Sequence, residues 1–149
     1  MDRRDLILAR LFAVLQAVPG VAQVVRNRGT LESDKRPAIQ MMDSDEKPED
    51  TPFNKARPAF APNRVRLTPE IYITLATLQP DELGPSLNVL RAALIKAVLL
   101  DQQLFNLVGG PSGDIRYDGC ITDLGKGRDL VGQMAVSITF VYILRPVEL

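Results

Sequence analysis

A glycine-rich stretch near the end of the chain, residues 119–132 (GCITDLGKGRDLVG), has the residue types of a phosphate-binding loop. In such a loop a glycine, four residues and then Gly-Lys-Ser/Thr open a helix, so that backbone N–H groups converge on the anion. Here five residues separate Gly119 from Gly125, and Gly127 follows Lys126 where Ser or Thr would bind magnesium. The alternating apolar residues on either side favour the turn of a β-hairpin over a nucleotide site.

A run of carboxylates in the middle of the chain has the chemistry to bind calcium, because hard cations take several carboxylates from one flexible loop. An EF-hand loop also requires a central glycine, and this run has none. A solvated loop is the favoured interpretation. A small metal-binding enzyme that uses this acidic loop is the remote alternative. The acids are Asp43, Asp45, Glu46, Glu49 and Asp50.

Nucleophilic catalysis finds little support in the composition. The chain has no histidine, which removes the commonest general base and metal ligand. Ser44 and Lys47 match the Ser-x-x-Lys spacing of serine acyl enzymes, but Pro48 follows directly and neighbouring acids keep the lysine protonated. Cys120, the only cysteine, lies in an alternating segment, where we expect a small buried residue instead of a nucleophile. The sequence therefore predicts no catalytic residue and no cofactor.

Length and charge indicate one soluble domain spanning residues 1–149. Lys plus Arg and Asp plus Glu number 18 each, so no net field attracts the chain to nucleic acid or to a membrane. The apolar N-terminal segment is interrupted by Arg10 and Gln16, which argues against a signal or a membrane span. A single cysteine suits a reducing cytoplasm.

Two segments have the spacing of amphipathic helices. Residues 3–18 place apolar side chains three and four apart before Pro19 and Gly20 end the pattern. Residues 86–100 do the same, with Pro85 suited to the first turn and 101–108 as a continuation.

Five segments have the residue types or the alternation of strands. In the last of them, Met134, Val136, Ile138, Phe140, Tyr142 and Leu144 share one face, which must be buried. The grouping of strands predicts an α+β fold: a mainly antiparallel sheet packed against two helices on one face. The five segments are 21–29, 36–43, 64–77, 114–124 and 133–146.

Residues 43–63, with four prolines and no apolar period, are expected to form a long loop. Loops of more than about 12–15 residues in compact domains are usually functional or disordered, which suggests a role outside the subunit's own core. Phe53 and Phe60 stand among the prolines and are available to a neighbouring surface.

Charged residues at the ends of the expected strands have two interpretations. Alternation places Arg116 and Asp118 opposite Ile115 and Tyr117, and it places Arg26 and Arg28 together. A solvated sheet face is the simpler interpretation. Across a subunit boundary, the same charges would fix orientation and register.

The order and intervals of five segments resemble the tail terminator or tail completion proteins of long-tailed bacteriophages and related tail-like particles. These are ILARLFAVLQAVPGV, RNRG, RPAIQMMDSDE, GDIRYDGCITDL and GRDLVGQMAVSITFVYIL. The resemblance implies a virion protein of the tail, assembled in the host cytoplasm. It would form a homo-oligomeric ring, expected to be a hexamer, on the finished tail tube.

Such a ring would halt tube growth and present a surface for joining tail to head. Its partners would be the tail tube protein, a neck or head-completion protein, and DNA only as it passes through the lumen. A neck or adaptor ring protein is the nearer alternative. Heterologous ring contacts use strand edges and protruding loops. We therefore select as interface candidates Arg26, Arg28, Asp43, Asp45, Phe53, Phe60, Arg116, Asp118, Lys126 and Arg128.

Overall fold

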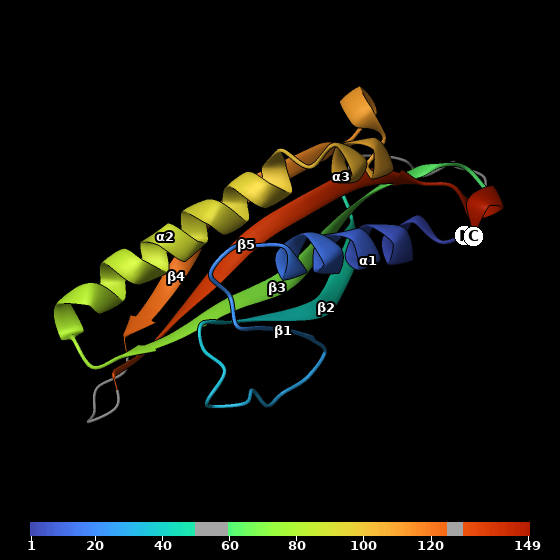
Figure 1. Ribbon diagram of the computed structural model, residues 1–149. Helices are drawn as coiled ribbons and strands as arrows, with labels where there is room; N and C mark the ends of the chain where they lie inside the picture. Colours follow the sequence, from blue (N-terminus) through green and yellow to red (C-terminus); the bar gives the residue numbers. More distant parts are fainter. Residues whose placement is uncertain (50–59, 125–129) are drawn as a thin grey trace.

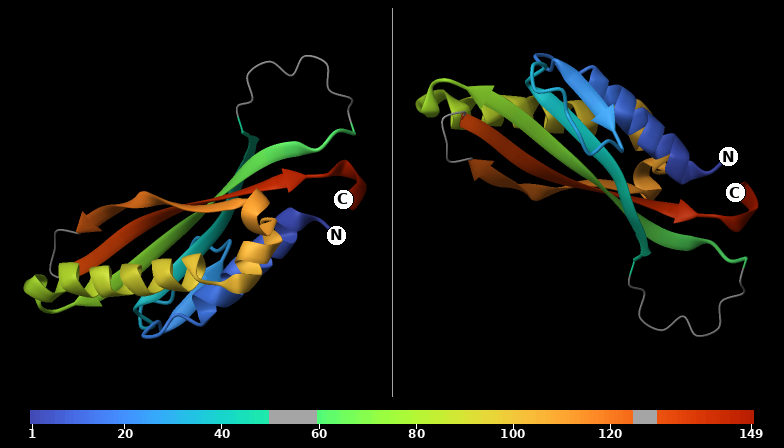
Figure 2. Two further views of the ribbon diagram at one scale, coloured as in Figure 1. Left: turned by 90° about the horizontal axis from the view of Figure 1, so that it is seen from above. Right: turned by 90° about the horizontal axis from the view of Figure 1, so that it is seen from below.

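The computed structural model describes residues 1–49, 60–124 and 130–149. They form a five-stranded sheet with α-helices packed on one face (Figures 1 and 2). The expected α+β class is therefore confirmed. The strands are β1 (Gln23–Arg26), β2 (Ala38–Pro48), β3 (Asn63–Thr77), β4 (Asp114–Leu124) and β5 (Leu130–Leu144), and the α-helices are α1 (Arg3–Gln16), α2 (Pro80–Leu99) and α3 (Gln102–Leu107).

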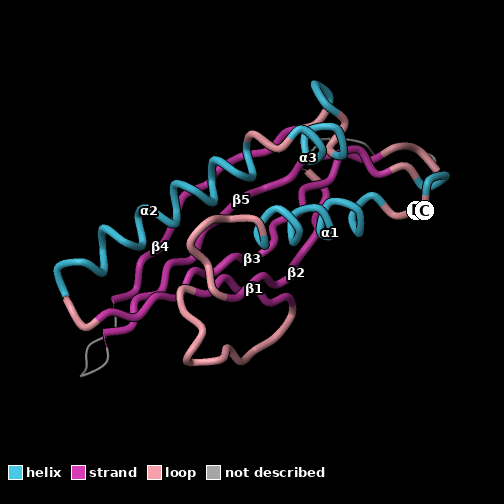
Figure 3. Tube along the Cα trace, viewed as in Figure 1, coloured by secondary structure: helices cyan, strands magenta, loops and turns pink. Residues whose placement is uncertain are grey.

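The strands lie in the order β1-β2-β3-β5-β4, which places β1 and β4 at the two edges of the sheet. Strands β2, β3, β5 and β4 pair antiparallel along this order, as expected for a mainly antiparallel sheet. The β1–β2 pair is parallel, with Gln23 opposite Ala38. A parallel pair needs a crossover, and residues 27–37, here termed the β1–β2 connection, provide it (Figure 3).

The core lies between the helices and one face of the sheet. In β5 the predicted burial is confirmed for Met134, Val136, Ile138, Phe140 and Tyr142, which are at most 2% exposed, whereas Leu144 is only partly buried. Helix α2 adds a stripe of leucines and a valine at helical spacing, which packs on β3 and β5. The buried residues of this stripe are Leu83, Leu87, Leu90, Leu94 and Val98.

Helix α2 begins earlier than its apolar spacing predicts. It starts at Pro80, so Pro85 lies inside the helix and not at its first turn. The acids Asp81 and Glu82 stand in the first turn and Lys96 in the last, which complements the helix dipole.

The expected continuation of α2 through residues 101–108 is a separate helix, α3. Asp101 caps α3 by accepting a hydrogen bond from the Leu104 N–H at 2.8 Å. The same carboxylate binds Arg10 of α1 in a bidentate pair, with N···O distances of 3.0 and 2.6 Å. This pair ties α1 to α3. No helix in the described ranges is long and apolar enough to cross a membrane.

The first part of the long loop expected over residues 43–63 is a strand instead. Strand β2 extends to Pro48 and β3 begins at Asn63, so the assignment of residues 43–48 to a loop was wrong. The Glu49 N–H still donates to the Arg64 carbonyl at 2.9 Å, which continues the pairing by one residue. Residues 50–59, which include Phe53, lie outside the described ranges.

A β-bulge in the edge strand β4 changes which residues share a face. Tyr117 pairs with Ile138 and Gly119 with Ser137, so Asp118 is the extra residue. Beyond the bulge Cys120 pairs with Val136 and is exposed, because it lies at the rim of the sheet. The expectation that Cys120 is buried was wrong.

Candidate subunit interface on the open sheet face

The sheet has one face that the described helices leave uncovered (Figure 2). We call it the open face. Its side chains are the outward-pointing residues of β2, β3, β5 and β4, and they are more polar than those that face the helices. In β3, for example, Thr68, Glu70 and Tyr72 alternate with the buried residues Leu67 and Ile71.

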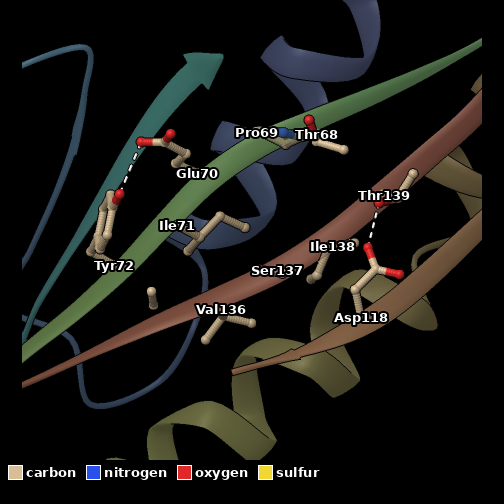
Figure 4. A pocket seen from close by; sticks show the side chains of 11 residues that line it. Thr68, Pro69, Glu70, Ile71, Tyr72, Asp118, Val136, Ser137, Ile138 and Thr139 are labelled. Carbon is tan, nitrogen blue, oxygen red and sulfur yellow. Dashed lines mark hydrogen bonds between the residues drawn. The ribbon is translucent and has the colours of Figure 1, made fainter. Parts of the chain in front are cut away.

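A shallow hollow of about 440 Å³ lies at the centre of the open face (Figure 4). We call it the central hollow. Its polar groups are the carboxylates of Glu70 and Asp118 and the hydroxyls of Thr68, Tyr72, Ser137 and Thr139.

Each of these two carboxylates accepts a hydrogen bond from a hydroxyl. The Tyr72 hydroxyl donates to Glu70 at 2.9 Å, and the Thr139 hydroxyl donates to Asp118. The bond to Glu70 raises the pKa of Tyr72. Within the described residues neither carboxylate has a cationic partner, so the hollow is locally acidic.

An ion-pair network on the open face joins Glu49, which follows β2, to β3 and β4. Glu49 binds Arg64 at 3.2 Å and Arg116 at 3.3 Å, and Arg116 also binds Asp114 at 2.6 Å. The hydrogen bond to Asp114 raises the pKa of Arg116. The network links the last residue before the undescribed segment to β3 and β4. Sequence reasoning missed it, because Glu49 appeared only as one acid among several and its pairing with Arg64 depends on the extension of β2.

Arg26 and Asp43, both interface candidates, bind each other. Two nearly parallel hydrogen bonds of 2.7 and 2.9 Å join the Arg26 guanidinium to the Asp43 carboxylate. This pairing lowers the pKa of Asp43 and raises that of Arg26. The nearby charges of Arg4 and Asp5 place the pair beside the start of α1, away from the central hollow. Both charges are therefore partly neutralised within the subunit.

Arg28 has a different setting. Strand β1 ends at Arg26, and Asn27 has a left-handed backbone with φ of 55°, so the strand alternation does not reach Arg28. The Gln40 side chain donates to the Arg28 carbonyl and fixes its backbone beside β2. The exposed Arg28 guanidinium has no ion-pair partner in the described part of the chain.

A second hollow, of about 450 Å³, lies where the β1–β2 connection meets the open face. It is lined in part by Arg36, Gln40, Thr74, Asp123 and Gln133. Arg36 Nε and Thr74 Oγ1 are buried and have no hydrogen-bond partner within the described ranges, and Thr74 as a whole is only 6% exposed. An unsatisfied buried polar atom costs about 1–3 kcal/mol. Hydrogen-bonding groups that reached these two atoms would therefore stabilise the subunit.

The structure thus separates the predicted interface residues. It brings Arg116 and Asp118 to one face, as expected, but pairs Arg26 with Asp43 elsewhere. Asp45 is exposed and lies 3.9 Å from Lys47. Phe60 is 73% exposed. The predictions for Phe53, Lys126 and Arg128 fall outside the described residues.

The acidic run does not converge within the described ranges. No three His, Cys, Asp or Glu side chains there are close enough together to hold a metal ion. Glu46 instead turns toward the helices and accepts a hydrogen bond from Tyr142, and burial raises its pKa. The chain matches no protein-family model and has no significant match among curated proteins.

Proposed function

We propose that this chain is a virion structural protein of a long-tailed bacteriophage or a related tail-like particle. In this role it forms a ring on the end of the tail tube, stops tube polymerisation and presents the surface to which the head and neck attach. Its partners are further copies of itself, the tail tube protein and a neck protein. The collinear sequence resemblance is the starting point of the proposal.

The open face is the structural observation that supports it most. A sheet that buries one face and leaves a polar, partly hollow face uncovered has a surface available to another protein. Free strand edges at β1 and β4 add backbone groups that a neighbour can contact. A ring requires two different patches on each subunit, and the two edges of one sheet provide them.

The test is assembly of tails without this protein, examined by electron microscopy. We expect tubes of uncontrolled length, or tails that do not join heads, and we expect normal tails when the wild-type chain is supplied. Tails of normal length that join heads in its absence would overturn the proposal. A reconstruction of the complete particle separates the two ring functions. Density on the last tube layer supports a terminator, and density one layer nearer the head supports a neck adaptor.

A further inference from the structure

Two groups of charges that make no ion pair among the described residues lie on different parts of the sheet. On the β1 side, Arg28 and Arg36 of the β1–β2 connection make no ion pair in the described part of the chain. Glu70 of the middle strand β3 and Asp118 of the edge strand β4 line the acidic central hollow. By contrast, Arg26 and Arg116 are paired with carboxylates of their own subunit.

The strand order separates the two groups across the sheet. Arg28 follows β1, which is one edge, whereas Asp118 is the bulged residue of β4, which is the other. A patch of one sign at one edge and of the opposite sign toward the other edge gives a head-to-tail contact. Repetition of such a contact closes a ring when the rotation between subunits allows it.

The second hollow gives an independent reason to expect a neighbour at the β1–β2 connection. Among the residues that the structure describes, Arg36 Nε and Thr74 Oγ1 lack hydrogen-bond partners, and both residues line this hollow. Native proteins rarely leave such atoms unsatisfied. Repositioning of the connection against a second copy would allow the Arg36 guanidinium to reach a carboxylate, which accepts two of its N–H groups at once.

We propose that the β1–β2 connection of one subunit, through Arg28 and Arg36, docks on the central hollow of the next copy, through Glu70 and Asp118. The proposal rests on the ring function and assigns it an interface. Complementary charges of this kind fix orientation and register between subunits. They also disfavour contact between the central hollows of two subunits, because two acidic surfaces repel each other.

Charge reversal tests the interface. One variant carries Arg28→Glu and Arg36→Glu, and the other carries Glu70→Lys and Asp118→Lys. Each alone places like charges across every contact, and we expect self-association to weaken by about tenfold or more. A mixture of the two restores both kinds of contact in alternating rings. We therefore expect equal amounts of the two variants to assemble into species larger than a dimer, measured by sedimentation and by mass spectrometry of rings on tail tubes.

Two results would overturn the interface: variants that assemble as well as the wild type, or a mixture that fails to recover. Lys96→Glu is the control, because it reverses one charge, as each single substitution of the first variant does, on an exposed site of α2, and it should assemble normally. If a reversal unfolds the subunit, Arg28→Gln and Asp118→Asn replace it. If the variant that combines Arg28→Gln and Asp118→Asn loses no more association than the weaker of the two single variants, the result supports contact between the two residues. Losses of association free energy that add in the combined variant would overturn it.

The two proposals fail in different ways. If wild-type subunits cap tails and the charge-reversed variants behave like the wild type, the proposed interface is refuted and the proposed function stands. Wild-type subunits that self-associate in solution with the expected charge dependence, but do not bind tubes, would remove the function and keep the interface. Wild-type subunits that neither self-associate nor bind tubes would overturn both.

Discussion

At the scale of single residues, Glu46 differs most from the other acids of its run. It lies in β2 among charged neighbours, yet it turns toward the helices and accepts a hydrogen bond from the buried Tyr142. Burial raises its pKa, and the charge of Arg4 opposes this effect only in part. The ionised form of Glu46 therefore opposes folding near neutral pH.

We predict that Glu46→Gln stabilises the subunit at pH 7. A folded pKa above the unfolded value of about 4.3 means that Glu46 contributes stability below that pH and loses it as the pH rises through the folded pKa. The amide keeps an acceptor for Tyr142 and never ionises. We expect a gain of at most about 1 kcal/mol, because the half-buried group is still partly solvated.

Urea unfolding at pH 7 and pH 4 measures this gain, which should shrink at the lower pH. Asp45→Asn, at the exposed neighbouring position, is the control and should change the free energy of unfolding by less than about 0.5 kcal/mol. A loss of stability in Glu46→Gln at pH 7 would contradict the sign.

At the scale of elements, the close approach of α2 to β5 determines the thickness of the core. A Cβ added at Gly132 of β5 would lie 2.9 Å from Leu87 Cδ1 and 3.0 Å from Leu83 Cδ1. The helix therefore packs directly on a strand position that has no side chain. This contact holds the first turns of α2 against the end of the sheet where β5 begins (Figure 1).

Gly132→Ala should lower the free energy of unfolding by about 1–3 kcal/mol, because the leucines of α2 must shift to make room. Gly84→Ala is the matched comparison within α2, since a Cβ there meets nothing within 4 Å. It should raise stability by up to about 1 kcal/mol through helix propensity. Thermal and urea unfolding measure both, and equal effects of the two alanines would refute the packing argument.

Elements with a strong local pattern could be predicted from the sequence. The alternation of β5 and the stripe of α1 identified many of the buried residues, because one-sided burial imposes its period on the sequence, although the α1 stripe omitted Ile7 and Val14. The extension of β2 through Asp43–Pro48 could not be predicted in the same way. Its polar residues tolerate solvent, its bulge between Met42 and Asp45 breaks the alternation, and pairing with distant β3 stabilises it.

Of the residues in the proposed interface, only Arg28 and Asp118 could be selected from the sequence, as charged positions near strand ends. The sequence does not show that Arg26 pairs with Asp43 while Arg28 makes no ion pair with the described residues, because that depends on the parallel pairing of β1 with β2. Glu70 and Asp118 come from strands separated by β5, so their common hollow exists only in the folded sheet. Arg36 gave no signal beyond its charge.

At the scale of the whole molecule, zero formal net charge limits long-range repulsion between copies. Association by the proposed interface would depend on a few local charge pairs, whereas the fold depends on a buried apolar core. Salt should therefore affect the two properties differently. This difference separates assembly from folding without any substitution.

We predict that raising ionic strength from about 0.1 M to 1 M weakens self-association while leaving the free energy of unfolding nearly unchanged. The Debye length falls from about 10 Å to about 3 Å over this range, which screens exposed pairs more than buried contacts. Sedimentation and urea unfolding at both salt concentrations measure the two effects. Association that strengthens with salt would instead indicate an apolar interface.

The bulge at Asp118 also limits what the free edge of β4 can template. A straight, evenly spaced edge strand accepts another strand, which offers the same edge again, and the result is a fibre without a natural end. The extra residue bends this edge and interrupts its ladder. The backbone itself thus discourages endless stacking, which suits a component that must be added a fixed number of times and then stop.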